Sequence, residues 1–146
     1  MKLVVQRVTQ ASVKVDGKTA GQIEEGLMVL VGFGVNDSEK EADYLAKKLV
    51  KLRIFEDGKG KMNLSVKDIN AKLLLVPQFT LYASTKKNRP SFHKALNPSI
   101  ASELFDYFTE KCREDVEVEC GVFGAFMKVE LLNNGPVTIL LEKEFE

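Results

Sequence analysis

The run Leu27-Met-Val-Leu-Val-Gly-Phe33 decides the fold, because it is continuously apolar and carries β-branched residues. A run of this length and composition predicts a strand that is buried on both faces. Upstream of it, Ala11-Ser-Val-Lys-Val15 alternates and leads into Asp16-Gly17, a strong signal for a tight hairpin turn. The partner strand of this hairpin is predicted at Thr19–Ile23.

Two segments on the C-terminal side of this run change to the helical period. Ser38-Glu-Lys-Glu41 has the form of a capping box, in which a hydroxyl residue is followed three positions later by glutamate. Asn97-Pro98 predicts the start of a second helix, because asparagine caps helices and proline is favoured at the first helical position. The buried faces are predicted at Ala42, Leu45, Ala46 and Leu49 in the first helix and at Ile100, Leu104, Phe105 and Phe108 in the second.

The remaining period-2 segments predict further strands. They are Leu3–Val8, Arg53–Glu56, Leu73–Leu81, Val116–Cys120, Phe126–Leu132 and Val137–Glu142. Many antiparallel strands with two helices predict an α+β fold: a single domain over residues 1–146, with an antiparallel, curved or barrel-like sheet on which two helices pack. Neither helix is predicted to be a Rossmann crossover, because Gly32-Phe33-Gly34 lacks the third glycine and the chain lacks the βαβ rhythm.

The composition excludes several classes of protein. The chain has 146 residues, of which 45% are apolar, and 21 basic residues balance 21 acidic ones, so it is not a disordered low-complexity chain. The longest uncharged stretch, Leu73–Thr85, has 13 residues, against the roughly 20 apolar residues of a membrane-spanning helix. The alternating, charged N-terminus does not resemble a signal peptide. We therefore expect a soluble cytoplasmic protein that does not contact membranes.

Cysteine and histidine are too few for several kinds of site. Two cysteines, Cys112 and Cys120, argue against a disulfide framework, and both are predicted as small residues of the core. His93 is the only histidine, so we expect no metal site and no cofactor. We expect His93 on the surface, which argues against an enzyme built on a Ser-His dyad.

The charges are unevenly distributed along the chain. Residues 69–102 carry five basic groups and no acidic group: Lys72, Lys86, Lys87, Arg89 and Lys94. Such a block suits a partner that bears phosphate groups. The alternative is a set of solvated lysines on a loop.

Two polar segments interrupt apolar strands. In Pro77-Gln-Phe-Thr-Leu81 the proline breaks the ladder and leaves backbone N–H groups free beside Gln78 and Thr80, which are the ingredients of an oxyanion site. The alternative is a strand end whose threonine faces solvent. Asn133-Asn-Gly-Pro-Val-Thr138 reads as a β-turn between two strands. A cis Gly135–Pro136 bond is the alternative, because proline cannot donate to the strand that would follow a tight hairpin.

Eight short segments, spread over essentially the whole chain, form a pattern. They are Val5-Gln-Arg-Val8, Ala11-Ser-Val13, Leu52-Arg-Ile-Phe-Glu56, Lys61-Met-Asn-Leu-Ser-Val66, Gln78-Phe-Thr-Leu-Tyr-Ala83, Arg89-Pro-Ser-Phe92, Phe123-Gly-Ala-Phe-Met127 and Asn134-Gly-Pro-Val-Thr138. Together they resemble the D-aminoacyl-tRNA deacylase family, whose order of motifs they follow. The resemblance implies a homodimeric hydrolase that cleaves the ester between a D-amino acid and the terminal adenosine of tRNA, and that also removes glycine mischarged on tRNA.

The resemblance also implies how chirality is read. Gly135 and Pro136 are expected to form a cis peptide that reaches across the dimer into the partner's pocket. There, the carbonyl oxygens of this peptide would bind the α-ammonium group of the substrate and exclude an L side chain. Arg7, Met127 and Asn134 are expected to support the pocket, and Arg7 does so by bracing the Gly-Pro loop.

Catalysis is expected at Gln78, Phe79 and Thr80, where backbone amides stabilise the oxyanion. Thr80 acts either as nucleophile or as a hydrogen-bonding group beside an attacking water, with the 2′-OH of the terminal ribose assisting. We favour the water, because no base is visible beside Thr80. The chain departs from the family pattern at Pro77, where most members have serine.

The basic residues Lys86, Lys87 and Arg89 are expected to contact tRNA phosphates without reading sequence. The expected partners are therefore aminoacylated tRNA and a second copy of the chain, and DNA is not expected. Two other functions remain open at this point. One is a tRNA-binding module without catalysis that uses the block 69–102, and the other is a hydrolase of small free esters with Thr80 as nucleophile.

Overall fold

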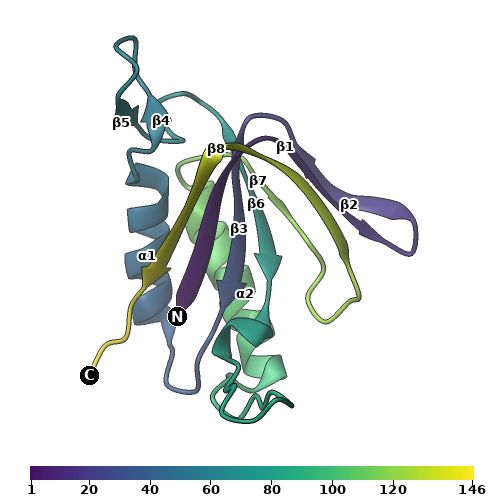
Figure 1. The fold of residues 1–146 in the computed structure, drawn as a ribbon. Helices are drawn as coiled ribbons and strands as arrows, with labels where there is room; N and C mark the ends of the chain where they lie inside the picture. Colours follow the sequence, from purple (N-terminus) through teal and green to yellow (C-terminus); the bar gives the residue numbers. More distant parts are fainter.

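The computed structural model describes all residues from 1 to 146. The elements, drawn in Figure 1, are β1 (Lys2–Val15), β2 (Lys18–Ile23), β3 (Gly26–Gly32), α1 (Glu39–Lys51), β4 (Phe55–Glu56), β5 (Met62–Leu64), β6 (Lys72–Pro77), the short 3-10 helix η1 (Phe79–Tyr82), α2 (Pro98–Arg113), β7 (Val118–Cys120) and β8 (Lys128–Glu142). No helix in this set has the length and apolar character needed to cross a membrane.

The main sheet has the strand order β2-β1-β3-β6-β7, and β8 pairs with β1. β1 is antiparallel to all its partners, and the predicted hairpin at Asp16-Gly17 is confirmed. β3–β6 and β6–β7 are parallel, so the prediction of an antiparallel sheet is wrong in this half. Parallel neighbours need long crossover connections, and α1 and α2 lie in these two connections. The sequence did not predict these crossover connections, because β4 and β5 follow α1 and η1 precedes α2, so strands and helices do not alternate simply along the chain.

The sheet curls, so the long strand β1 contributes to two apolar clusters. Leu3 and Val5 belong to the larger cluster, which lies between the sheet and the two helices. Farther along β1, Ala11 and Val13 belong to a second cluster, together with residues of β2, β3 and β6. A Cβ atom on Gly21 of β2 would lie 2.7 Å from the carbonyl oxygen of Cys120 in β7, so the two edges of the sheet nearly meet. The predicted α+β fold with a curved, barrel-like sheet and two packed helices is confirmed.

Both helices begin where their caps predict. The Ser38 side chain accepts from the Lys40 N–H at 3.3 Å, and the Asn97 side chain accepts from the Ser99 N–H at 3.0 Å. The predicted buried faces are confirmed except at Ile100, whose side chain is 53% exposed. Ala101 takes the core side of this first turn instead, because it falls on the same stripe as the buried side chains of later turns.

The two cysteines are free thiols. Cys112 lies in the core, as predicted, and burial raises the pKa of its thiol to about 12. Cys120 is only half-buried.

Glu41 is a buried carboxylate that closes the capping box of α1. Burial alone would raise its pKa, but N–H groups of Ser38 and Phe145 and the Ser38 hydroxyl donate to it, and the pKa is lowered. We expect Glu41→Gln to lower the free energy of unfolding by about 1–2 kcal/mol at neutral pH, because hydrogen bonds to a charged acceptor become neutral ones.

A lowered pKa means that this stabilisation is present above the pKa of glutamate in the unfolded chain and is lost as the pH falls through the lower, folded value. Urea unfolding at several pH values measures it. The exposed Glu39→Gln variant is the control and should unfold like the wild type. A difference between Glu41→Gln and the wild type that persists in strong acid would contradict the assignment.

Candidate functional site

The strand that was predicted to run from Leu73 to Leu81 ends at Pro77, so that prediction is wrong in its second half. The Gln78 N–H donates to the Val31 carbonyl at 2.8 Å, and the chain then turns into η1. Pro77 has no N–H to donate on the β7 side, and the Gln78 N–H makes the last bond to β3.

The start of η1 gathers polar groups at the surface. Phe79 and Thr80 are its first residues, so their backbone N–H groups have no acceptor within the helix. No side-chain oxygen accepts from these N–H groups either, and the Gln78 amide donates to the Thr80 hydroxyl. Two backbone donors, one hydroxyl and one amide therefore lie together, which can stabilise an oxyanion.

Thr80 has no base beside it. Its hydroxyl bonds only to the Gln78 amide, and neither a carboxylate nor an imidazole is hydrogen-bonded to it. His93 is exposed, as predicted, and its Nδ1 lies 3.2 Å from the Ser91 hydroxyl instead. An unactivated hydroxyl is a weak nucleophile, so the geometry favours a role for Thr80 other than attack.

Two glycines let η1 pack on the end of β3. A Cβ on Gly32 would lie 2.9 Å from the Leu81 Cβ, and a Cβ on Gly34 would lie 2.6 Å from the Tyr82 ring. Only residues without a side chain permit this approach. This pair lacks the third glycine of a dinucleotide fingerprint, and its role is instead to let η1, which carries Thr80, pack closely.

A cavity of about 370 Å³ lies beside Gln78 and Phe79. Its lining is mainly apolar: Val31, Phe33, Pro77, Gln78, Phe79, Phe92, Ala95, Leu96, Asn97, Pro98, Ala101, Phe123 and Gly124. The rings of Phe79 and Phe92 meet edge to face, with centroids 4.9 Å apart. An apolar, aromatic cavity with few polar groups suits a planar base.

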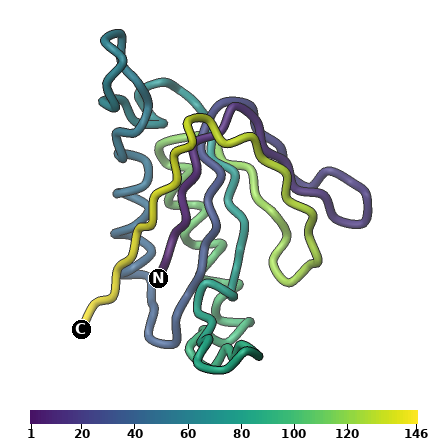
Figure 2. Tube along the Cα trace, in the orientation of Figure 1, coloured from purple at the N-terminus to yellow at the C-terminus, as the bar shows by residue number.

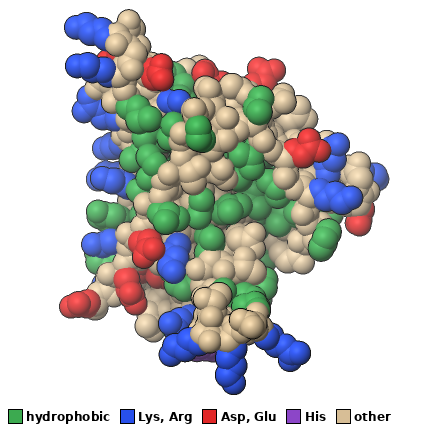
Figure 3. Space-filling view, viewed as in Figure 1, with side chains coloured by type: hydrophobic (Ala, Val, Ile, Leu, Met, Phe, Trp, Pro, Cys, Tyr) green, Lys and Arg blue, Asp and Glu red, His purple; other side chains and the backbone are tan.

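The loop after η1 carries the predicted basic residues. Ser84 and Ser91 exchange backbone hydrogen bonds of 2.8 and 3.0 Å and close the loop. Lys86, Lys87 and Arg89 are exposed at its tip and form no ion pair. In Figure 3, Lys and Arg side chains gather at this lower end of the molecule.

Met127 lies near the same end of the sheet. A Cβ on Gly121 would lie 2.7 Å from the Met127 sulfur and 3.7 Å from the Pro77 Cδ, so Met127 and Pro77 flank Gly121. The sulfur also accepts from the Val122 N–H at 3.4 Å. Met127 therefore borders the segment that carries Gln78, and it does not contact the Gly-Pro loop.

The Gly-Pro segment does not form a turn between two strands. β8 runs continuously from Lys128 to Glu142, so the β-turn interpretation is wrong, and the Gly135–Pro136 bond is cis. Gln6 pairs with Thr138, and Val8 pairs with Asn133. Between these two pairs, one residue of β1 lies opposite four residues of β8. Residues 134–137 therefore bulge out of the ladder as a projecting loop.

Arg7 links this loop to a second segment. Its side chain is buried, Nε donates to the Asn134 carbonyl at 2.7 Å, and Nη1 donates to the Ile54 carbonyl at 2.9 Å. The planar guanidinium holds two carbonyls at once, which lysine cannot do with the same geometry.

Asn133, which was not among the predicted site residues, also holds the loop. Its Oδ1 accepts from the Val137 N–H at 2.7 Å, and its Nδ2 donates to Gln6 Oε1 at 3.1 Å and to Thr138 Oγ1 at 3.1 Å. Asn134, the predicted residue, takes part only through its backbone carbonyl. A pair of asparagines before Gly-Pro was the available signal, but sequence alone did not distinguish which side chain bonds to the backbone.

Within one chain the two halves of the predicted site lie apart. Arg7 pairs in register with Leu27 at the start of β3, whereas Gln78 bonds to Val31 near its end. Four residues of strand span about 13 Å. Figure 2 shows the Gly-Pro segment at the upper end of the sheet and the segment after β6 at the bottom of the molecule.

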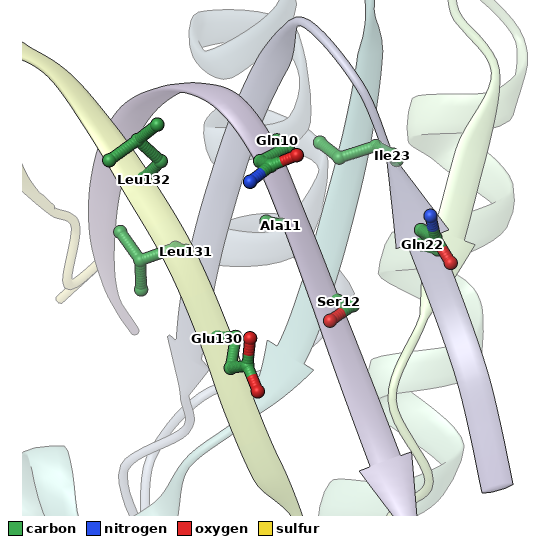
Figure 4. Close-up of a pocket in the computed structure, with 8 residues that line it drawn as sticks. All are labelled: Gln10, Ala11, Ser12, Gln22, Ile23, Glu130, Leu131 and Leu132. Atoms are coloured by element: carbon green, nitrogen blue, oxygen red, sulfur yellow. The ribbon is translucent and has the colours of Figure 1, made fainter.

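A further hollow of about 280 Å³ crosses β1, β2 and β8 (Figure 4). Its lining is Gln10, Ala11, Ser12, Gln22, Ile23, Glu130, Leu131 and Leu132. Glu130 is its single ionisable group, so the hollow has no acid–base pair. No group of three His, Cys, Asp or Glu side chains in the chain is placed to hold a metal ion.

Comparisons with known proteins show the family and the fold. A family model described as D-Tyr-tRNA(Tyr) deacylase matches residues 4–142. A solved structure described as c-Myc DNA Unwinding Element Binding Protein is 42% identical, with a TM-score of 0.95 over 99% of this chain and 100% of that chain. A structure of a probable eukaryotic D-amino acid tRNA deacylase is 18% identical, with a TM-score of 0.82 over 96% of this chain and 97% of that chain, which shows the same fold.

Proposed function

The chain belongs to the D-Tyr-tRNA(Tyr) deacylase family, as its motifs predict, and from this premise we propose that it hydrolyses the ester between a D-amino acid and the 3′-terminal adenosine of tRNA. Glycine mischarged on tRNA is a second substrate. The reaction proofreads aminoacyl-tRNA in the cytoplasm and uses no cofactor.

The observation that carries this proposal is the pair of unused backbone donors at Phe79 and Thr80 beside an aromatic cavity. With the terminal adenine in the cavity, the ester lies next to these donors. Each backbone donor to a tetrahedral oxyanion contributes typically ~2.7–4 kcal/mol of transition-state stabilisation.

Water is the attacking group in this proposal. The Thr80 hydroxyl bonds to the Gln78 amide and has no base, which makes it a poor nucleophile. Thr80 instead contributes a hydrogen bond, and the 2′-OH of the terminal ribose assists the water. Assistance by the 2′-OH distinguishes this mechanism from that of a hydrolase of small free esters, because such esters lack the 2′-OH.

Chirality is read by the backbone of Gly135 and Pro136. Arg7 and Asn133 hold this loop from two sides, which supports a rigid loop that can discriminate by shape. Its carbonyl oxygens bind the substrate's α-ammonium group, and the space left beside them admits a D side chain or glycine but not an L side chain.

A homodimer joins the two halves of the site. Val4, Leu30 and Leu140 share the sheet face that points away from the helices, and Leu140 is 66% exposed. Figure 3 shows apolar side chains over this face. If the twofold axis lies in this interface and runs across the strands, it reverses their direction, and the Gly-Pro end of one subunit meets the η1 end of the other.

Lys86, Lys87 and Arg89 bind phosphates of the tRNA close to its 3′ end. They lie on the closed loop that follows η1, next to the cavity. This contact is electrostatic and does not depend on tRNA sequence.

The test is release of labelled amino acid from D-tyrosyl-, L-tyrosyl- and glycyl-tRNA. We expect the D and glycyl esters to be cleaved and the L ester to remain. Binding of all three tRNAs without cleavage would favour the alternative, a tRNA-binding module that uses the same basic loop. Cleavage of a small tyrosine ester in the absence of tRNA would favour a general esterase.

A further inference from the structure

A second group of cations lies along α1 and the β4–β5 hairpin. We define the α1–hairpin patch as Lys47, Lys48, Lys51, Arg53, Lys59 and Lys61, all of them exposed. In Figure 3 basic side chains form a column along α1 and continue onto the β4–β5 hairpin. Four of the six line a hollow of about 410 Å³ together with Tyr44 and Leu52.

The charges of the α1–hairpin patch are not neutralised within the chain. None of its members forms an ion pair with an acidic side chain. Arg53 donates to the carbonyl and side chain of the neutral Asn63. Asp57, the acid of the hairpin turn, accepts from the backbone N–H groups of Lys59 and Lys61 at 2.8 and 3.1 Å.

The patch is joined to the Gly-Pro loop by Arg7. Arg7 bonds to the carbonyl of Ile54, next in the chain to Arg53, and to the carbonyl of Asn134, next to Gly135. The patch therefore lies at the end of the sheet that, in the proposed dimer, enters the partner's site.

We propose that the α1–hairpin patch binds the phosphate backbone of the tRNA whose 3′ end occupies the partner subunit's cavity. This inference rests on the proposed function. Each tRNA would then contact the basic loop of the subunit that holds its 3′ end and the α1–hairpin patch of the other subunit. Lys47 and Lys51 lie one helical turn apart, about 6 Å along the axis, so both face the same stretch of backbone.

An anionic membrane is the other surface that such a basic patch could bind. A helix that lies on a membrane presents a large apolar face to it. The apolar face of α1 is instead buried against the sheet and α2, and the hollow between the lysines is concave. These observations favour RNA.

The test is equilibrium binding of a fluorescent, uncharged tRNA transcript at several salt concentrations. The double variant Lys47→Gln/Lys51→Gln is expected to bind about tenfold more weakly at ~50 mM salt, with a slope of log Kd against log salt smaller by about 1.5. The matched control, Lys14→Gln/Lys18→Gln, removes two exposed lysines from the far hairpin and should bind like the wild type.

Equal losses in the two double variants, or no loss in the first, overturn the inference. So does a first variant that keeps its tRNA affinity but no longer binds phosphatidylserine vesicles that the wild type binds, because the patch would then serve a membrane. The binding measurement is independent of catalysis. A wild type that cleaves no D-tyrosyl-tRNA would therefore defeat the proposed function while the comparison of Kd values still decides on the patch.

Discussion

Gly135→Ala is expected to reduce the turnover of D-tyrosyl-tRNA by about 100-fold, because a displacement of about 1 Å at a positioning group has an effect of this size. At Gly135, φ is +150°, and an added Cβ would lie 2.8 Å from the Val137 Cγ2 and 2.9 Å from the Val137 nitrogen. The backbone nitrogen cannot move away alone, since the Val137 N–H is held by Asn133. The loop that reads the substrate must therefore shift.

Single-turnover release of labelled D-tyrosine measures this effect, and thermal unfolding checks that the variant is folded. Gly17→Ala is the control, because φ is also positive there, at +77°, but nothing lies within 4 Å of the added Cβ. Gly17→Ala is expected to lose a little stability and to keep its activity. Wild-type turnover in Gly135→Ala would remove the Gly-Pro loop from the mechanism.

Mixed dimers are expected to show that each site is built from two subunits. Ala95 lines the cavity and is half-buried, so Ala95→Trp fills the space proposed for adenine and should abolish cleavage. A dimer of one Gly135→Ala subunit and one Ala95→Trp subunit retains one open cavity that faces one normal loop. It should recover about half of the wild-type activity, although the Gly135→Ala homodimer keeps only about a hundredth of it and the Ala95→Trp homodimer none.

The reciprocal dimer pairs the wild type with a subunit that carries both substitutions. In the proposed arrangement, one site has the blocked cavity and the other has the altered loop, so neither works. A site contained within one subunit predicts the reverse: no activity in the first mixed dimer and half in the second. Co-expression with two affinity tags yields both species for the same deacylation assay.

Local interactions made much of this chain predictable. The capping box at Ser38, the Asn97-Pro98 start and the Asp16-Gly17 turn depend on residues a few positions apart, and all three are confirmed. The run Leu27–Phe33 is buried over almost all its length because no polar side chain interrupts it. The Gly-Pro motif was also visible in the sequence, as were Gln78 and Thr80.

The errors occurred where distant residues decide the outcome. Whether the chain after Pro77 stays extended depends on Gly32 and Gly34, whose lack of a side chain lets η1 pack against the end of β3. Whether Asn133–Thr138 turns back depends on β1, which pairs with β8 on both sides of the bulge. No pattern within either segment contains that information.

The sequence by itself determined the caps, the hairpin, the buried strand and the family, because these follow from neighbouring residues or from a recognisable order of motifs. Only the tertiary structure decided that Gly135 and Thr80 lie at opposite ends of the sheet of one chain. It also revealed that the six cations of the α1–hairpin patch, which are spread over residues 47–61, lie on one side of the molecule. Helix α1 and the β4–β5 hairpin leave all six of these cations exposed, and none of them forms an ion pair.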